Sequence, residues 1–167
     1  MLPSESTLAE QMAVVDAENL YLARCAFGQF LATSLTREFA QLYHALAPTQ
    51  AYRPDTAGVG QRRLRNLCLS ILNELDEAEY RTWAQQQFNQ ADNMTDQFAA
   101  LVVLANAPGD AGRVALAAFY ERWQAEALVV DKWLAVQSGS RLPNTLAEVE
   151  RLAQGEIFDI RNPNKVY

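Results

Sequence analysis

The chain has 167 residues and a formal net charge of −6, and its composition is 50% hydrophobic and 20% charged, which is enough for one folded domain with its own core. The acidic balance argues against nucleic acid as a partner, because phosphate binding needs a surplus of Lys and Arg on one face. No apolar run approaches the roughly 20 residues of a membrane-spanning helix, and the first ten residues lack the basic and apolar regions of a signal peptide.

The N-terminal part of the chain is rich in helix signals, and strand signals are nearly absent. Ser4 or Ser6 is a suitable cap for a short first helix that runs through Val14. Asp16 then opens an apolar-periodic stretch that continues to the next proline. Because this stretch is long for one helix of a globular protein, we expect a break at residues 33–34.

A loop with the sequence APTQAYRPD, residues 47–55, separates these helices from the next one, which Asp55 opens. Apolar residues then recur with the i, i+3, i+4, i+7 spacing of a helix that buries one stripe. The expected stripe consists of Leu64, Leu67, Cys68, Ile71, Leu72 and Leu75.

Helix starts continue through the C-terminal half. The expected first residues or caps are Asp76, Asn93, Asp110 and Thr145. Asp76 with Glu79 and Thr145 with Glu148 fit the pattern of a capping box, and Asn93 has Asp96 three positions later.

The helix expected over residues 127–138 is apolar on more than one side, with Asp131 and Lys132 beside that face. This pattern favours a buried core helix over a cofactor-binding segment. Asn162 followed by Pro163 is the last helix start. The polar residues gathered there could bind an anion at the helix N-terminus, or they could belong to a frayed end, and both interpretations stay open.

Eight or nine helices with short connections predict an all-α fold. Tyr43, Trp83 and Trp123 are spaced 40 residues apart, and Tyr80 and Tyr120 repeat at the same interval. This is the period of HEAT and armadillo helix pairs, although coincidence is an equal alternative because the positions between these anchors match poorly. We expect a superhelical array, a HEAT/armadillo-like α-solenoid, rather than a four-helix bundle.

Few residues could support catalysis. His44 is the only histidine, whereas a His-based zinc site, a Ser–His–Asp triad or a Cys–His pair needs histidine at defined positions, so a surface or packing role is favoured. The acids of Asp92–Asp96 lack the further ligands and the glycine of a calcium loop, so Asn93 is expected to cap a helix there. Cys25 and Cys68 lie in apolar patterns and are expected to be buried free thiols, which favours a cytoplasmic location.

Five stretches along the chain together resemble one known family. In order, they are LPSES near the start, RLRNLCLSIL at 63–72, QFNQADNMTD at 87–96, LVVDKWLAVQ at 128–137 and NPNKVY at 162–167. In this order and at these spacings they resemble the C-terminal helical domain of bacterial aminopeptidase N, the alanyl aminopeptidase of the gluzincin class. The resemblance extends over nearly the whole chain.

The resemblance implies a large zinc metallopeptidase, a hydrolase that removes N-terminal residues from peptides. Its zinc is held by an H-E-x-x-H helix and a further Glu, and this chain lacks that motif. The chain is therefore expected to hold no metal or cofactor, to be inactive alone, and to meet peptide substrates only through the parent polypeptide. The family's last domain packs over the catalytic domain and encloses the active-site chamber, so the implied partner is the catalytic domain of the same polypeptide.

By the same resemblance, residues 1–167 form a single helical domain, a fragment of a longer multi-domain chain in which the helix at Asn162 continues. The segment that approaches the chamber contains Asn162, Asn164 and Lys165, which are the expected substrate-chamber contacts. Lys165 matches the first basic position after the NPN motif, whereas Tyr167 stands where a further Arg is often found.

Two functions of other classes stay open. A free-standing helical-repeat protein-interaction module would present a concave surface to a protein partner. A small helical ligand-binding protein would use a pocket near Trp133 instead.

Overall fold

The computed structural model describes residues 3–166, except for the side chains of Asn164 and Val166. Over this range the chain forms α-helices and one short 3-10 segment, η1, without any strand. The elements are α1 (Glu5–Ala9), α2 (Ala17–Ser34), α3 (Thr36–Ala45), α4 (Thr56–Leu72), η1 (Asn73–Leu75), α5 (Ala78–Gln90), α6 (Met94–Ala105), α7 (Ala111–Trp123), α8 (Ala127–Ser138), α9 (Thr145–Ala153) and α10 (Pro163–Val166).

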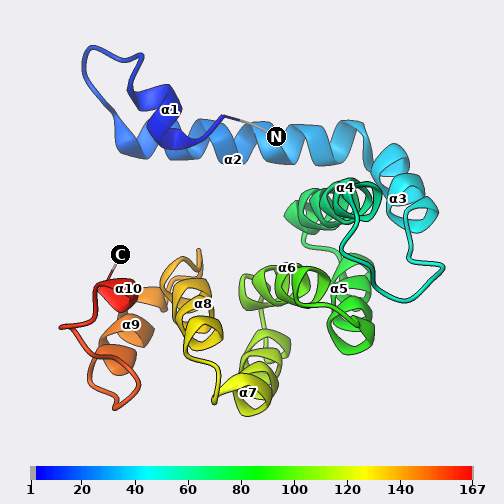
Figure 1. Ribbon diagram of the computed structural model, residues 1–167. Coiled ribbons are helices and arrows are strands. Elements are labelled where there is room, and N and C mark those ends of the chain that lie inside the picture. Colours follow the sequence, from blue (N-terminus) through cyan, green and yellow to red (C-terminus); the bar gives the residue numbers. More distant parts are fainter. Residues whose placement is uncertain (1–2, 167) are drawn as a thin grey trace.

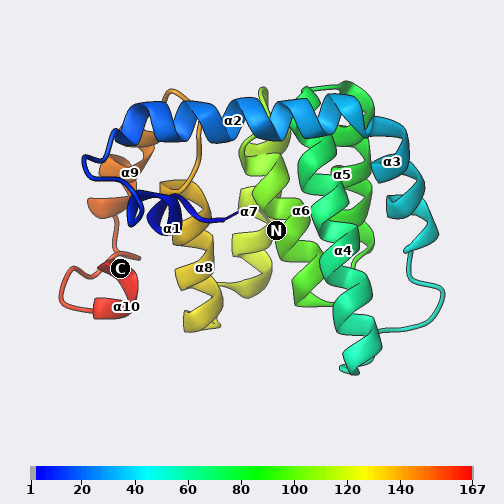
Figure 2. The ribbon, with the colours of Figure 1, turned by 90° about the horizontal axis from the view of Figure 1, so that it is seen from above.

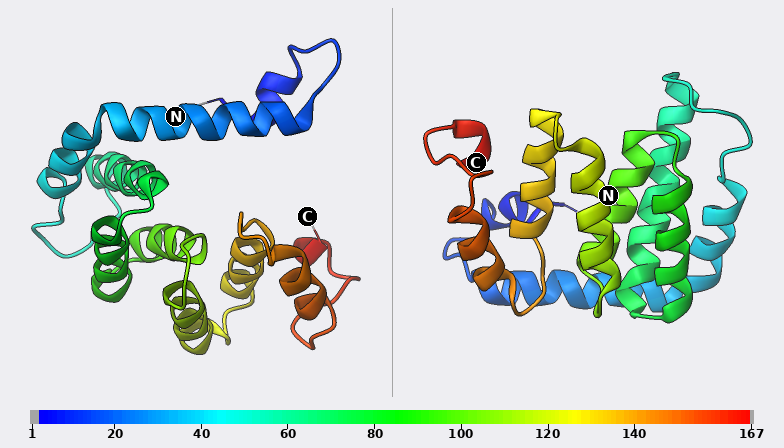
Figure 3. Two further views of the ribbon diagram at one scale, coloured as in Figure 1. Left: turned by 180° about the vertical axis from the view of Figure 1, so that it is seen from behind. Right: turned by 90° about the horizontal axis from the view of Figure 1, so that it is seen from below.

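The helices form a curved array of two layers. Along the arc, α4, α6 and α8 make the inner layer, and α3, α5, α7 and α9 make the outer layer (Figure 1). The long helix α2 lies across the concave side and runs crosswise to the others, as Figure 2 and the reverse views in Figure 3 show. The predicted all-α superhelical array is confirmed, and in the described range α2 to α9 are the helices longer than five residues.

The 40-residue spacing of aromatic residues follows this layering. Tyr43, Trp83 and Trp123 lie on α3, α5 and α7, which are successive helices of the outer layer. The rings of Tyr43 and Trp83 stack with centroids 5.2 Å apart and planes 4° from parallel. The interval therefore corresponds to one inner–outer helix pair, as expected for a solenoid.

The core lies between the two layers, with α6 near its centre. Its largest fully buried side chains are Cys68, Leu69, Leu72, Leu101, Leu104 and Phe119. Helices α6 and α7 approach each other closely at Gly112, where an added Cβ would lie 2.3 Å from the carbonyl oxygen of Leu104. Only a residue without a side chain fits this position, because 2.3 Å is far inside van der Waals contact.

Most helix starts follow the expected caps. The side chains of Asp16, Asp55 and Asn93 each accept a hydrogen bond from a backbone N–H of the first helical turn. The long stretch after Asp16 breaks at Leu35, between α2 and α3, one residue beyond the expected position. The caps depend on hydrogen bonds between residues two or three positions apart, so the residue types in the sequence are sufficient to predict them.

Three local expectations were wrong. Helix α1 ends at Ala9 rather than Val14. Asp76 does not cap α5, because it adopts a left-handed conformation with φ of 54° at the end of η1, and its carboxylate pairs with Arg81. Thr145 is the first residue of α9 rather than its cap, and its hydroxyl donates to the carbonyl of Ser140. In both cases a competing contact takes the side chain away from the helix N-terminus.

Candidate functional site

Three consecutive side chains of α8 contact three different elements. Asp131 Oδ1 lies 2.9 Å from Lys165 Nζ on α10. Lys132 Nζ lies 5.5 Å from the ring centroid of Phe98 on α6. Trp133 Nε1 donates a 2.9 Å hydrogen bond to the carbonyl of Leu116 on α7. Successive residues of a helix point about 100° apart, so one short stretch can join three neighbours.

Helix α8 is accordingly a core helix, as expected. Its buried residues are Val130, Trp133, Leu134, Val136 and Gln137. The two charged residues beside this face are used in contacts between helices rather than in holding a cofactor. The sequence identified the face correctly but gave no sign of which residue each charge would meet.

The Asp131–Lys165 ion pair positions the end of the described chain. Lys165 exposes 14% of its side-chain surface and Asp131 exposes 17%, so water screens their attraction only weakly. A second acid lies nearby: the Arg161 guanidinium and backbone N–H hold the pKa of Asp159 below its ordinary value, and the charge of Lys165 adds to this effect. The ammonium group of Lys165 is thus compensated by carboxylates of this chain.

The other two expected contact residues lie beside this pair in sequence. Asn162 is half-buried, its backbone N–H donates to the carbonyl of Asp159 at 2.9 Å, and its own carbonyl accepts from the N–H of Lys165 at 3.0 Å. The side chain of Asn164 and the whole of Tyr167 lie outside the described residues. The structure therefore brings Asn162 and Lys165 together in one tight turn, with Pro163 as the first residue of α10 as expected.

The stretch QFNQADNMTD builds a hydrogen-bonded chain through four helices. Asn93 Oδ1 caps α6 by accepting from the N–H of Asp96, whose Oδ1 accepts from Asn66 at 2.8 Å. Gln87 donates to Asn66 Oδ1 at 2.7 Å and accepts from the Tyr43 hydroxyl at 3.2 Å. The expected capping role of Asn93 is confirmed, and these buried polar groups satisfy one another.

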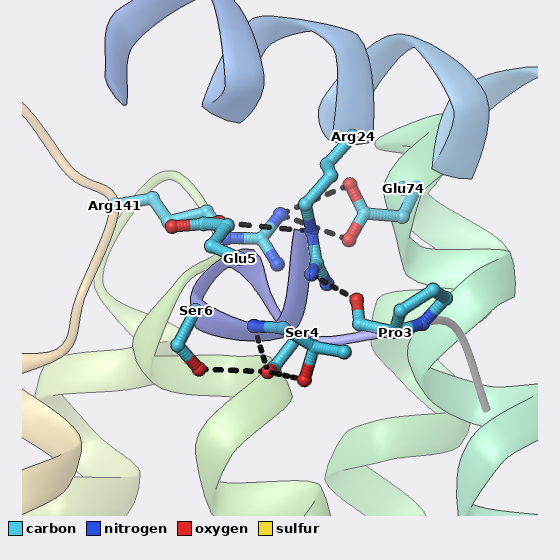
Figure 4. A network of polar contacts seen from close by, with 8 residues as sticks. Pro3, Ser4, Glu5, Ser6, Arg24, Glu74 and Arg141 are labelled. Atoms are coloured by element: carbon cyan, nitrogen blue, oxygen red, sulfur yellow. Dashed lines mark hydrogen bonds and ion pairs between the residues drawn. The ribbon is translucent and has the colours of Figure 1, made fainter. Parts of the chain in front are cut away.

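Figure 4 shows two neighbouring polar contacts, one that joins α2 to α1 and one that joins the segment after α8 to η1. Arg24 of α2 lies 3.6 Å from Glu5 of α1 and also donates to the carbonyl of Pro3. Nearby, Arg141 after α8 pairs with Glu74 of η1 at 2.9 Å. The sequence gave no signal for the second pair, because 67 residues separate its partners.

The described part of the chain offers no donor set for a zinc ion. His44 packs edge-on against Trp83, with ring centroids 4.4 Å apart, and is the only histidine. Among residues 3–166, no group of three or more His, Cys, Asp or Glu is placed to hold a metal. Both cysteines are free thiols, and Cys68 is buried as expected whereas Cys25 is only half-buried. No helix in the described part of the chain combines the length and the hydrophobicity needed to cross a bilayer.

A groove of about 530 Å³ lies between α7, α8 and α9, with Trp133 and Leu116 in its wall. The arginines at its rim are paired: Arg113 lies 3.1 Å from Asp110, and Arg151 contacts Glu148. The groove thus presents an apolar wall and compensated charges, with little to recognise a small charged ligand.

Comparison with known proteins places this arrangement among helical-repeat domains. A family model described as "Domain of unknown function (DUF3458_C) ARM repeats" matches residues 1–167. Aminopeptidase N of Haemophilus influenzae and that of Escherichia coli are each 32% identical over 165 residues, which is 99% of this chain and 19% of each relative. Aminopeptidase N of Caulobacter vibrioides is 33% identical over the same length, again 19% of its own chain.

A solved structure shares the same fold. The crystal structure of Legionella pneumophila aminopeptidase A in complex with aspartic acid matches 100% of this chain with a TM-score of 0.84 and 29% identity, and the match covers 21% of that chain. The present chain therefore spans about a fifth of the length of the relatives it matches.

Proposed function

The chain belongs to the DUF3458_C ARM-repeat family, whose model matches it from end to end, and we propose that it is a non-catalytic helical domain of a bacterial aminopeptidase N. Over nearly the same length it is similar to the C-terminal regions of such aminopeptidases. The observation that carries this proposal is the match of 165 residues to only 19% of each relative. In this role the domain covers the active-site chamber and limits which peptides enter it.

The shape of the array supports a covering role. A curved two-layer solenoid presents an extended surface that is held rigid by contacts between neighbouring helices. Here the contacts of α8 with α6, α7 and α10 join the far end of the arc into one body. A rigid cover restricts access by its shape, which needs no reactive group in the cover itself.

Zinc, which such an aminopeptidase requires for hydrolysis, belongs to the catalytic domain under this proposal. The residues of this chain do not fit a catalytic zinc, since one histidine that packs against Trp83 cannot supply the usual three protein ligands. The partner is accordingly the catalytic domain of the same polypeptide. Peptide substrates bind in that complete polypeptide and not to this domain alone. The two free thiols favour a cytoplasmic location.

The turn that contains Asn162, Asn164 and Lys165 is the segment we assign to the chamber. Asp131 compensates Lys165, so the turn offers polar groups rather than a free positive charge. A peptide carboxylate that reached Lys165 would have to compete with Asp131 for the ammonium group. Lys165 therefore serves mainly to hold the turn on α8, through its ion pair with Asp131.

An activity assay tests the proposal. The isolated chain should release no alanine from an alanyl reporter substrate, with or without added zinc. The complete gene product should carry an H-E-x-x-H motif before this domain and should hydrolyse the reporter in a chelator-sensitive way. Zinc-dependent hydrolysis by the isolated chain, or a gene that encodes only this array, would refute the proposal, and the second outcome would favour a free-standing interaction module.

A further inference from the structure

Helix α2 is apolar on two opposite sides, but the array covers only one of them. The covered side faces α4 and η1, and Ala32 is the one residue of α2 that is buried. The opposite side carries an apolar stripe at helical spacing, here named the α2 ridge. It consists of Leu22, Ala23, Ala26, Phe27 and Phe30, all of them exposed.

The α2 ridge has the character of an interface rather than of ordinary surface. Leu22, Phe27 and Phe30 are 52%, 46% and 62% exposed. The rings of Phe27 and Phe30 stack with centroids 6.4 Å apart, so they form one aromatic surface. An exposed stripe of apolar side chains on one side of a helix is normally covered by a partner, and aromatic residues are enriched in the buried centres of interfaces.

The ridge is also held in a fixed place. Asp16 caps α2, and Arg24 on another side of the helix ties it to α1 through Glu5 (Figure 4). Helix α2 also packs against α4 and η1. A partner that docks on the ridge would meet a preorganised surface, which reduces the entropic cost of binding.

The area of the ridge argues against a second copy of this chain as its partner. The ridge runs over nine residues, from Leu22 to Phe30, which is about 13 Å of helix, and a stripe about 10 Å wide along it offers roughly 130 Å². A stable complex between separate molecules buries about 800 Å² on each side. A surface of this size is sufficient when the partner belongs to the same polypeptide, because linkage gives an effective concentration in the millimolar range.

We propose that the α2 ridge is the surface on which the rest of the aminopeptidase polypeptide docks. This inference rests on the proposed function, under which four-fifths of the polypeptide lies outside this domain, as in the relatives of which the chain covers about a fifth. The docked partner presents an apolar surface to Phe27 and Phe30. The polar groups of the turn at residues 162–165 take no part in this contact.

Site-specific photo-crosslinking in the complete gene product tests the inference. A benzoylphenylalanine residue in place of Phe30 should crosslink within the same polypeptide to a peptide outside residues 1–167, identified by mass spectrometry. Val114, which is 57% exposed on α7 of the outer layer, is the matched control position and should give no such crosslink. A crosslink to a second copy, or none at all, would overturn the inference.

A substitution experiment provides a second readout. The variant L22S/F30S should lower the melting temperature of the complete gene product by several degrees and leave that of the isolated chain unchanged, whereas V114S should change neither. Equal effects on both proteins would show that the ridge serves only this domain, and would refute docking. If the complete product crosslinks as expected but fails to hydrolyse the alanyl reporter, the docking surface stands and the aminopeptidase assignment fails.

Discussion

Breaking the Asp131–Lys165 pair should detach α10 from α8. Removing one partner of a fully buried ion pair costs about 3–5 kcal/mol, because it leaves a charge without compensation. Here both side chains are largely buried, at 17% and 14% exposure, but α10 is a single turn that can move away and let water reach the remaining charge. The cost is therefore limited to undocking that turn, and we expect D131N and K165M each to lower the free energy of unfolding by about 1–2 kcal/mol.

A double-mutant cycle in urea measures this contact. Because either single change already breaks the pair, D131N/K165M should cost little more than one of them, which gives a coupling energy of about 1–2 kcal/mol. The exposed Asp110–Arg113 pair is the control, and D110N should have no measurable effect on unfolding. Hydrogen exchange at the amide of Lys165, which donates to the carbonyl of Asn162, should quicken in both single variants. Strictly additive single effects would show that the pair does not hold α10.

Four further predictions follow from packing, burial and exposure. G112A should destabilise the protein by about 2 kcal/mol or more in calorimetry, because its Cβ would meet a backbone carbonyl of α6 at 2.3 Å, whereas G60A, which meets no atom within 4 Å, should be neutral or stabilising. Burial raises the pKa of Tyr43, so the unfolded chain ionises first, and stability that is complete below the ordinary pKa of 10.0 should fall as the pH rises above it. Urea melts between pH 8 and 11 should show a smaller alkaline loss for Y43F, and an unchanged loss would contradict this account. Burial also raises the pKa of the Cys68 thiol, so iodoacetamide should label the half-exposed Cys25 first, and equal rates in the native protein would be inconsistent with the fold. The isolated chain should form no stable dimer through the α2 ridge, because its area is far below the roughly 800 Å² that each side of a stable complex buries, and a dimer in sedimentation velocity that L22S/F30S abolishes would contradict docking within one polypeptide.

Features that depend on neighbours in sequence could be predicted, and they decided the fold class. The caps Asp16, Asp55 and Asn93 act within one helical turn, so their residue types were sufficient. The same rule was wrong at Asp76 and Thr145 because other groups, Arg81 and the carbonyl of Ser140, take up their side chains. A capping signal states what a side chain can do locally, and tertiary contacts decide whether it does so.

Features that depend on distant residues gave no such signal. Asp131 and Lys165 are 34 positions apart, and nothing in either stretch indicates that they meet. The stripe expected on α4 shows the same limit: Cys68 and Leu72 are buried, but Leu64 is 40% exposed and Leu69, outside the stripe, is buried. Periodicity identifies which residues share a face, whereas the inner position of α4 in the array determines how wide the buried face is.

Helices α10 and α2 differ in whether this chain itself supplies the partners of their side chains. The charge of Lys165 is compensated by Asp131 within the domain, so an ion pair of this chain holds the turn at residues 162–165 on α8. The α2 ridge is apolar and exposed to water, so covering it with another apolar surface is favourable in free energy. It follows that substitutions in the ridge should change how the domain sits on its partner while leaving the turn intact, and that substitutions in the ion pair should release the turn while leaving the docking unchanged. Under the proposed function, a domain that fixes its polar turn by its own ion pair can be attached through a separate apolar surface without disturbing that turn.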